Sequence, residues 1–261
     1  MEGGRDQIVT SPGAAAPLVL AVPVFNGERF LAETLASLQE QGADVRWWLQ
    51  DGGSTDGTVE IARRLARPGD RIVSEPDAGQ ADALNRAFQA MGGEIIGFLN
   101  ADDLLLPGAA RTVLEYFAAH PDIDLVCGEV EWIDEHSAVT GRHAGRITSL
   151  AEVLDIYGVW WADRQWVQPE VFFRRALWEK VGGFDPAWTL VFDYDFWVRC
   201  FRAGAWGSRI CQWRSLAFAA TPRRNPPPPA APPTRFAPWC GGTSTRARRC
   251  PRCAAGRWRR G

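Results

Sequence analysis

The sequence predicts an α/β fold in which a doubly wound, mostly parallel sheet is flanked by helices. One observation is the alternation of apolar strand-like runs with segments of helical period along the first 133 residues. A second is the continuous apolar run at residues 18–25 (LVLAVPVF), typical of a strand that is buried on both faces. With 46% hydrophobic and 23% charged residues, the chain has enough apolar material for a packed core, which excludes disorder throughout.

The first strand is followed by a segment with one apolar helical face. We expect Asn26 to cap this helix and Gly42 to end it. The residues of the apolar face are Phe30, Leu31, Thr34, Leu35 and Leu38.

The same alternation continues through the rest of the predicted sheet. We expect strands at 45–50, 71–74, 94–99 and 125–133, and helices around 59–65, 82–91, 107–120 and 193–203. In an open sheet of this kind, ligands bind beyond the carboxyl ends of the strands. The loops at those ends are therefore where the chemistry is expected.

Acidic residues follow two of these strands. Asp51 ends the strand at 45–50, while Asp102 and Asp103 follow the strand at 94–99. Neither GxGxxG nor GxxxxGK[ST] follows any strand, so a nucleotide would have to be held in another way. Carboxylates repel a diphosphate but can hold Mg²⁺ or Mn²⁺, which binds one. Taken alone, an Asp-Asp pair at a strand end is most often a helix cap or a solvated turn.

Motifs along residues 17–209 occur together in one order. They are 23–26 (PVFN), 51–58 (DGGSTDGT), 75–85 (EPDAGQADALN), 100–103 (NADD), 182–185 (GGFD) and 192–197 (FDYDFW). In this order they resemble glycosyltransferase family 2, the inverting nucleotide-sugar transferases with a GT-A fold. The resemblance implies a GT-A type sheet and a nucleoside-diphosphate sugar as donor.

The resemblance also implies a role for each matching residue. Asp51 would hold the base or ribose of the donor, and the start of the helix near Gln80 would face the phosphates. The implied donor-binding residues are Pro23, Asn26, Asp51, Gln80, Asp82, Asn85 and Asn100.

Metal binding and catalysis are assigned to three carboxylates in the same way. Asp102 would be the main ligand of Mg²⁺ or Mn²⁺, supported by Asp103 and Asn100. Asp193 would be the general base that takes the proton of the acceptor hydroxyl; the alternative is a cap of the helix at 193–203. The chain departs from the family pattern at Asn100, where relatives have Asp, and at Phe192, where many have Glu.

The predicted function is a metal-dependent, inverting transfer of a sugar to a hydroxyl of a saccharide or lipid-linked acceptor, in cell-surface polysaccharide synthesis. The alternative is a catalytically impaired, nucleotide-sugar-binding remnant, truncated at its C-terminal end. Either an acceptor surface or the last layer of core is expected at Trp160, Trp161, Trp166, Gln168 and Pro169. No run of about 18 apolar residues occurs. We therefore expect a cytoplasmic protein, with peripheral attachment to the inner membrane face left open.

Composition divides the chain into three parts. We expect a disordered leader at 1–16, the GT-A domain at 17–210, and an irregular Pro/Arg-rich tail at 211–261. All 31 acidic residues precede residue 196, whereas 14 of the 29 basic residues follow it. The tail could be a basic nucleic-acid-binding arm, with Cys250 and Cys253 as half of a zinc site. We prefer to interpret it as translation in a shifted reading frame, and we expect no nucleic-acid partner.

The remaining residues of interest receive no catalytic role. His136 and His143 lie in a polar stretch and are expected to be solvated loop residues. Cys127 and Cys200 are expected to be buried thiols in a reducing compartment.

Overall fold

The computed structural model describes residues 6–9, 16–134, 136–203 and 210–222. The strands are β1 (Asp6–Val9), β2 (Leu18–Val24), β3 (Val45–Asp51), β4 (Arg71–Ser74), β5 (Ile95–Phe98), β6 (Leu104–Leu105), β7 (Leu125–Ile133), β8 (Val139–His143), β9 (Val171–Arg174) and β10 (Ile210–Pro222). The helices are α1 (Leu31–Gln39), α2 (Thr58–Leu65), α3 (Gln80–Ala90), α4 (Ala109–Ala119), α5 (Leu150–Leu154), α6 (Ile156–Val159), α7 (Arg175–Val181) and α8 (Phe192–Arg202), with a 3₁₀ turn, η1, at Gln168–Glu170.

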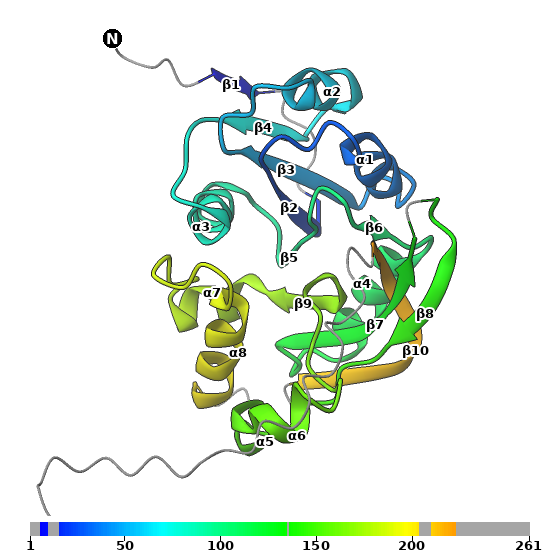
Figure 1. Cartoon of the computed structure of the whole chain (residues 1–261), viewed down its shortest axis with the longest axis vertical. Coiled ribbons are helices and arrows are strands. Elements are labelled where there is room, and N and C mark those ends of the chain that lie inside the picture. Colours follow the sequence, from blue (N-terminus) through cyan, green and yellow to red (C-terminus); the bar gives the residue numbers. More distant parts are fainter. Residues whose placement is uncertain (1–5, 10–15, 135, 204–209, 223–261) are drawn as a thin grey trace, which may run out of the picture. The chain divides into compact units, whose positions relative to one another are not determined.

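The strands form a mixed sheet in the order β1-β4-β3-β2-β5-β9-β7-β10-β6, with β8 paired to β7 (Figure 1). The run β4-β3-β2-β5 is parallel throughout. β9 is antiparallel to both of its neighbours, β5 and β7. The predicted α/β class is thus confirmed, and the parallel run brings the carboxyl ends of four strands to one edge.

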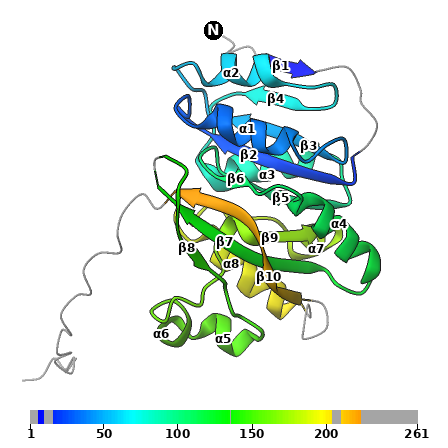
Figure 2. The same ribbon diagram turned by 90° about the vertical axis from the view of Figure 1, so that its right-hand side faces the viewer.

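Both faces of β2 are covered, which explains its uninterrupted apolar sequence. Val19 and Ala21 belong to a cluster that includes Leu84 and Phe88 of α3. Alternate residues such as Leu20 belong to a second cluster, which includes the buried leucines of α1. Figures 1 and 2 show α1 and α3 on opposite sides of the sheet. Successive side chains of a strand point to opposite faces, so a strand between two helical layers must be apolar at every position.

An aromatic cluster joins the second half of the chain to α3. Phe88 packs edge-on against Phe173 of β9 at 5.9 Å between ring centroids. Phe173 contacts Phe196 of α8 at 5.5 Å, and Phe196 contacts Phe184 at 4.9 Å. Aromatic pairs of this geometry stabilise a core beyond their buried area. The cluster therefore fixes α8 against the sheet.

Helix starts differ from the sequence prediction at Asn26. α1 begins at Leu31 with Phe30 at its N-cap position, and no side chain caps it. Asn26 instead adopts a left-handed backbone conformation, with φ 51°, and its side-chain oxygen accepts the N–H of Thr55 at 2.9 Å. The polar side chain is used to join two loops rather than to begin a helix, because the chain between Asn26 and Leu31 first turns.

The predicted leader and tail both contain strand. β1, inside the expected leader at 1–16, pairs antiparallel with β4. β10 covers the start of the expected tail at 211–261. It is parallel to β7, and its first residue, Ile210, pairs with Leu125. Backbone pairing with a strand edge needs no side-chain periodicity, which is why sequence pattern missed both strands. The CxxC segment at 250–253 lies outside the described residues.

Burial of the histidines and cysteines was predicted in part. His143 is only 4% exposed, and its Nε2 lies 2.7 Å from the carbonyl oxygen of Gln165, so the expectation of a solvated residue is wrong. It is the last residue of β8, whose pairing with β7 turns it inward. Cys127 and Cys200 are buried, as expected.

Within the described ranges, none of the helices combines the length and apolarity needed to cross a bilayer.

Candidate functional site

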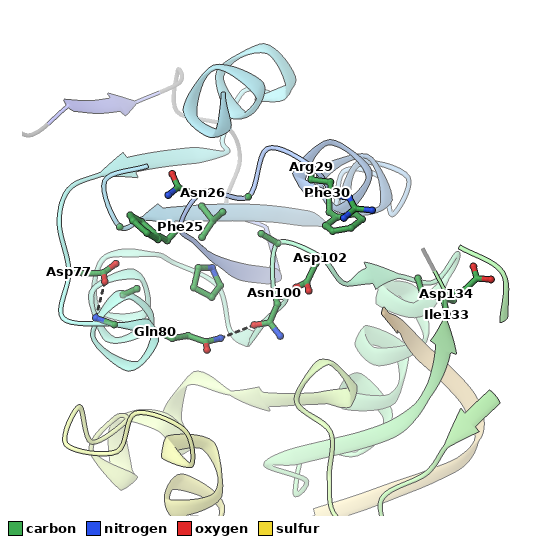
Figure 3. A pocket seen from close by; sticks show the side chains of 17 residues that line it. Phe25, Asn26, Arg29, Phe30, Asp77, Gln80, Asn100, Asp102, Ile133 and Asp134 are labelled. Atoms are coloured by element: carbon green, nitrogen blue, oxygen red, sulfur yellow. Dashed lines mark hydrogen bonds between the residues drawn. The ribbon is translucent and has the colours of Figure 1, made fainter. Parts of the chain in front are cut away.

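A cavity of about 1220 Å³ opens at the edge where the parallel strands end (Figure 3). Its lining comes from the segments after β2, β3, β4, β5 and β7 and from the start of α3. The lining residues are Pro23, Val24, Phe25, Asn26, Gly27, Arg29, Phe30, Gly52, Asp77, Gly79, Gln80, Ala83, Asn100, Ala101, Asp102, Ile133 and Asp134. The cavity lies where an open parallel sheet binds its ligands.

Five of the residues predicted from the sequence line this cavity: Pro23, Asn26, Gln80, Asn100 and Asp102. A hydrogen bond of 2.7 Å from Gln80 Nε2 to Asn100 Oδ1 joins the start of α3 to the segment after β5. In Figure 3, Phe25 and Asp77 lie toward one side and Asp134 toward the other, with Asn100 and Asp102 between them. Motifs far apart in the sequence thus surround one elongated cavity.

Asp51 does not line the cavity. Its side chain is fully buried and accepts hydrogen bonds from the Gly53 N–H at 3.2 Å, from the Ser54 hydroxyl, and from the Ser74 hydroxyl at 2.6 Å. A buried carboxylate needs such donors to offset its desolvation. In this structure Asp51 organises the loop between β3 and α2, whose Gly52 lines the cavity.

Asp82 and Asn85 of α3 also lie away from the cavity lining. Asp82 forms an ion pair with Arg86 at 2.6 Å and accepts the N–H of Ala78 at 3.0 Å, which holds the chain at the start of the helix. Asn85 bonds the backbone of Phe184 in both directions. Both side chains hold segments next to the cavity in place.

The two aspartates after β5 lie in different places, one in the protein interior and one at the cavity. Asp103 is 1% exposed and accepts a hydrogen bond of 2.9 Å from Asn100 Nδ2, whereas Asp102 is half-buried and lines the cavity. Among the described residues, no group of three or more His, Cys, Asp or Glu side chains could hold a metal ion. Mg²⁺ is commonly held by one or two carboxylates together with phosphate oxygens of a substrate. Asp102 fits that mode of binding, in which the donor diphosphate supplies further ligands.

Charge in the cavity comes from three carboxylates and one cation among its described lining residues: Asp77, Asp102, Asp134 and Arg29. Burial raises the pKa of Asp77, and the nearby charge of Asp82 adds to the rise. The backbone N–H groups of Ala138 and His136 lower the pKa of Asp134 by bonding its carboxylate. The cavity is therefore acidic overall, and an anionic diphosphate would need a cation to offset this charge.

Sequence reasoning missed several lining residues. Phe25 is 66% exposed because β2 ends one residue earlier, and its ring is among the side chains that line the cavity. Arg29 lies over the ring of Phe30, 4.7 Å from its centroid. Asp77 follows β4 at the same sheet edge, and that position was the available signal for it. An exposed aromatic face suits a planar ligand group such as a nucleobase.

Asp193 lies outside the cavity lining, at the second residue of α8. The alternative of a helix cap is not supported, because Val191 is the N-cap residue and no side chain caps α8. The Asp193 carboxylate accepts the adjacent Tyr194 N–H at 2.8 Å. Burial raises the pKa of Asp193, an effect opposed by that N–H. The preceding ring, Phe192, packs 6.2 Å from Phe98 at the end of β5. The start of α8 is thereby fixed against the end of β5, four residues before Asp102.

The expected acceptor surface divides between core and exterior. Trp166 is 4% exposed and packs on Trp197 and Phe201 at 5.7 and 5.6 Å, so it belongs to the core. Pro169 is buried, and Gln168 donates from Nε2 to the carbonyl oxygen of Phe98. The exposed members of the set are Trp160 and Trp161.

Comparison with known proteins agrees with this geometry. The family model described as Glycosyl transferase family 2 matches residues 19–189. The chain is 31% identical over 193 residues to the "PGL/p-HBAD biosynthesis glycosyltransferase" of Mycobacterium bovis BCG, covering 72% of this chain and 71% of the relative.

Two solved structures share the fold. Staphylococcus aureus TarS 1-349 in complex with UDP-GlcNAc has a TM-score of 0.64 at 18% identity, covering 80% of this chain and 59% of that one. The mannosyltransferase PcManGT from Pyrobaculum calidifontis, in complex with GDP-Man and Mn²⁺, has a TM-score of 0.58 at 20% identity, covering 86% and 62%. This chain therefore spans about three fifths of each structure.

Proposed function

Because the chain belongs to glycosyl transferase family 2, we propose that it transfers a sugar from a nucleoside-diphosphate sugar to a hydroxyl of a saccharide or lipid-linked acceptor, with inversion at the anomeric carbon. The observation that supports this most is the cavity at the carboxyl edge of the sheet, whose lining joins the PVFN, EPDAGQADALN and NADD segments. A role in cell-surface polysaccharide assembly, a cytoplasmic location and peripheral membrane attachment are retained as predictions.

The donor would lie along the cavity with its base near Phe25 and Asp77. The ring of Phe25 offers an apolar face, and the Asp77 carboxylate offers an acceptor for base or ribose donors. Arg29 is the cavity cation that can approach the diphosphate. Asp51, Ser54 and Ser74 would hold the surrounding loop rather than contact the donor.

Asp102 is the residue proposed to hold Mg²⁺ or Mn²⁺, together with the donor diphosphate. It is a half-buried carboxylate of the cavity, and Asn100 and Asp103 fix the turn around it. When bound, the cation offsets the negative charge that develops on the departing diphosphate. Asn100, in place of Asp, leaves this segment one negative charge short of the family pattern. The PcManGT complex with Mn²⁺ supports the choice of metal.

Asp193 is the proposed general base. As the acceptor oxygen bonds to the anomeric carbon, the bond from that carbon to the diphosphate oxygen breaks, and the acceptor proton moves to the Asp193 carboxylate. One such carboxylate is enough for inversion, because no covalent sugar intermediate forms. Its raised pKa makes it a better proton acceptor than an ordinary aspartate.

The test is release of nucleoside diphosphate from a panel of UDP-, GDP- and dTDP-sugars with Mn²⁺ or Mg²⁺, and transfer to a panel of acceptors. We expect the unmodified chain to be active with one donor class, and Asp102→Ala and Asp193→Ala to be inactive. Asp195→Asn is the matched control, since Asp195 pairs with Arg199 at 2.8 Å. Metal-dependent donor binding without release would instead favour the catalytically impaired alternative. No binding of any donor would contradict the proposal.

A further inference from the structure

Five large apolar side chains are exposed on α5, α6 and the residues that follow. This aromatic patch comprises Leu154, Ile156, Tyr157, Trp160 and Trp161, all between 37% and 73% exposed. The rings of Tyr157 and Trp161 are stacked, with centroids 6.2 Å apart. Single exposed apolar residues are ordinary, but a group of this size on one short segment marks an interaction surface.

The aromatic patch adjoins the proposed base. The ring of Trp160 packs edge-on against Tyr194, with centroids 5.4 Å apart. The hydroxyl of Tyr194 donates to the carbonyl oxygen of Val153 at 2.8 Å, which joins α8 to α5. Asp193 directly precedes Tyr194, so the patch contacts the residue next to the proposed base. Val191, the residue before α8, is also apolar and 39% exposed.

Local interactions hold the patch in this orientation. The carboxylate of Asp155 accepts the N–H of Gly158 at 2.8 Å and caps α6. Arg164 pairs with Glu152 at 3.0 Å and donates to the carbonyl of Arg146 at 3.2 Å. The rings therefore face outward from a fixed segment, and a ligand would meet a preformed surface.

The charges around the patch are acidic. Residues 150–163 and 184–195 contain six Asp or Glu residues and no Lys or Arg. Two of the basic residues that flank these ranges, Arg164 and Arg199, are paired with Glu152 and Asp195. An anionic bilayer surface or a nucleic acid would be repelled here. The surface suits a neutral, apolar group.

We propose that the acceptor carries an apolar aryl or alkyl group, which binds the aromatic patch while its hydroxyl reaches Asp193. This inference rests on the proposed function of Asp193. Stacking on a sugar ring would use aromatic faces alone, whereas Leu154 and Ile156 contribute only aliphatic area. The mixture of aliphatic and aromatic side chains therefore favours an apolar aglycone over a bare saccharide.

The test compares octyl and methyl glycosides of the common hexoses as acceptors. We expect KM for an octyl glycoside to be at least about tenfold lower than for its methyl counterpart. Trp161→Ala and Tyr157→Ala should remove most of this difference while leaving donor hydrolysis unchanged. Both side chains are about 70% exposed, so the variants should fold. Val139→Ala is the matched control, since Val139 is 56% exposed on β8 and outside the patch.

A direct measurement of glycoside binding tests this inference independently of the proposed function. Calorimetry with octyl and methyl β-glucoside, below the micelle concentration of the octyl compound, needs no turnover, while donor hydrolysis reports the donor site independently. Equal binding of the two glycosides, or a preference that survives both patch substitutions, would overturn the inference. The inference would also be overturned if the octyl preference is absent and the patch instead binds phosphatidylcholine vesicles or a second copy of the chain. Sedimentation with vesicles, or dimer formation, that is lost in Trp161→Ala and Tyr157→Ala would show this.

Discussion

The side-chain amide of Asn85 bonds the backbone of Phe184 on both sides. Its Nδ2 donates to the Phe184 carbonyl oxygen at 2.7 Å, and its Oδ1 accepts the Phe184 N–H at 2.9 Å. The ring of Phe184 packs 5.2 Å from Phe192, the residue before Asp193. This arrangement ties α3 to the start of α8 and makes Asn85 a positioning residue for the proposed base.

Asn85→Ala should therefore lower kcat and stability rather than donor affinity. It leaves the backbone groups of Phe184 without these partners, at a cost of about 1–3 kcal/mol in the free energy of unfolding. Urea unfolding and steady-state kinetics with varied donor would measure the two effects. Gln89→Ala, exposed on the same helix, is the control. A raised KM for donor with unchanged kcat would indicate direct donor contact instead.

Asp193→Asn should reduce kcat by about 10²–10⁴-fold, because general-base catalysis contributes on this order. Donor binding should not change. Since burial raises the pKa of Asp193, the unmodified chain should lose activity on acidification at a higher pH than an ordinary aspartate would impose. The acidic limb of the kcat–pH profile, where activity falls as the pH is lowered, measures this loss. If Asp195→Asn removes the limb and Asp193→Asn keeps it, the base is misassigned.

Asp102→Asn should abolish the response to Mn²⁺ or Mg²⁺ and reduce turnover by several orders of magnitude, since charge stabilisation by a bound cation contributes several kcal/mol. Chelation by EDTA should have the same effect on the unmodified chain. Asp134→Asn is the comparison, because the Asp134 carboxylate already accepts the N–H groups of His136 and Ala138. A metal titration of activity that is identical in Asp102→Asn and the unmodified chain would exclude Asp102 as ligand.

Glu170→Gln should flatten the pH dependence of stability. Glu170 is fully buried, with the Val167 N–H bonded to Oε1 at 2.9 Å, and burial raises its pKa well above the usual value of 4.5. The folded state thus favours the protonated form. Its contribution to stability is complete below pH 4.5 and is lost as the pH rises through the raised pKa.

At pH 8 the Glu170→Gln variant should therefore be more stable than the unmodified chain, with little difference near pH 4. Urea unfolding across this range is the measurement. Glu115→Gln, exposed on α4, should follow the unmodified chain at every pH. A variant less stable at pH 8 would show that the carboxylate is stabilised in the folded state.

The sequence by itself determined the sheet and the edge that carries the site. The strands at 71–74 and 125–133 have the predicted bounds, and β2, β3 and β5 differ from prediction by only one or two residues at their ends. Strand and helix periods are local properties of the chain, so they can be read without knowing what packs against them. Asn100 and Asp102, which the sequence places directly after a buried strand, both line the cavity.

Tertiary structure alone decided which motif residues face the cavity. Asp102 and Asp103 are adjacent in sequence, yet one lines the cavity and the other is buried against Asn100. Asn85 meets Phe184, 99 residues away, and β10 pairs with β7 across a similar separation. Side-chain direction and strand pairing depend on partners brought together only when the chain folds, and no local pattern contains them.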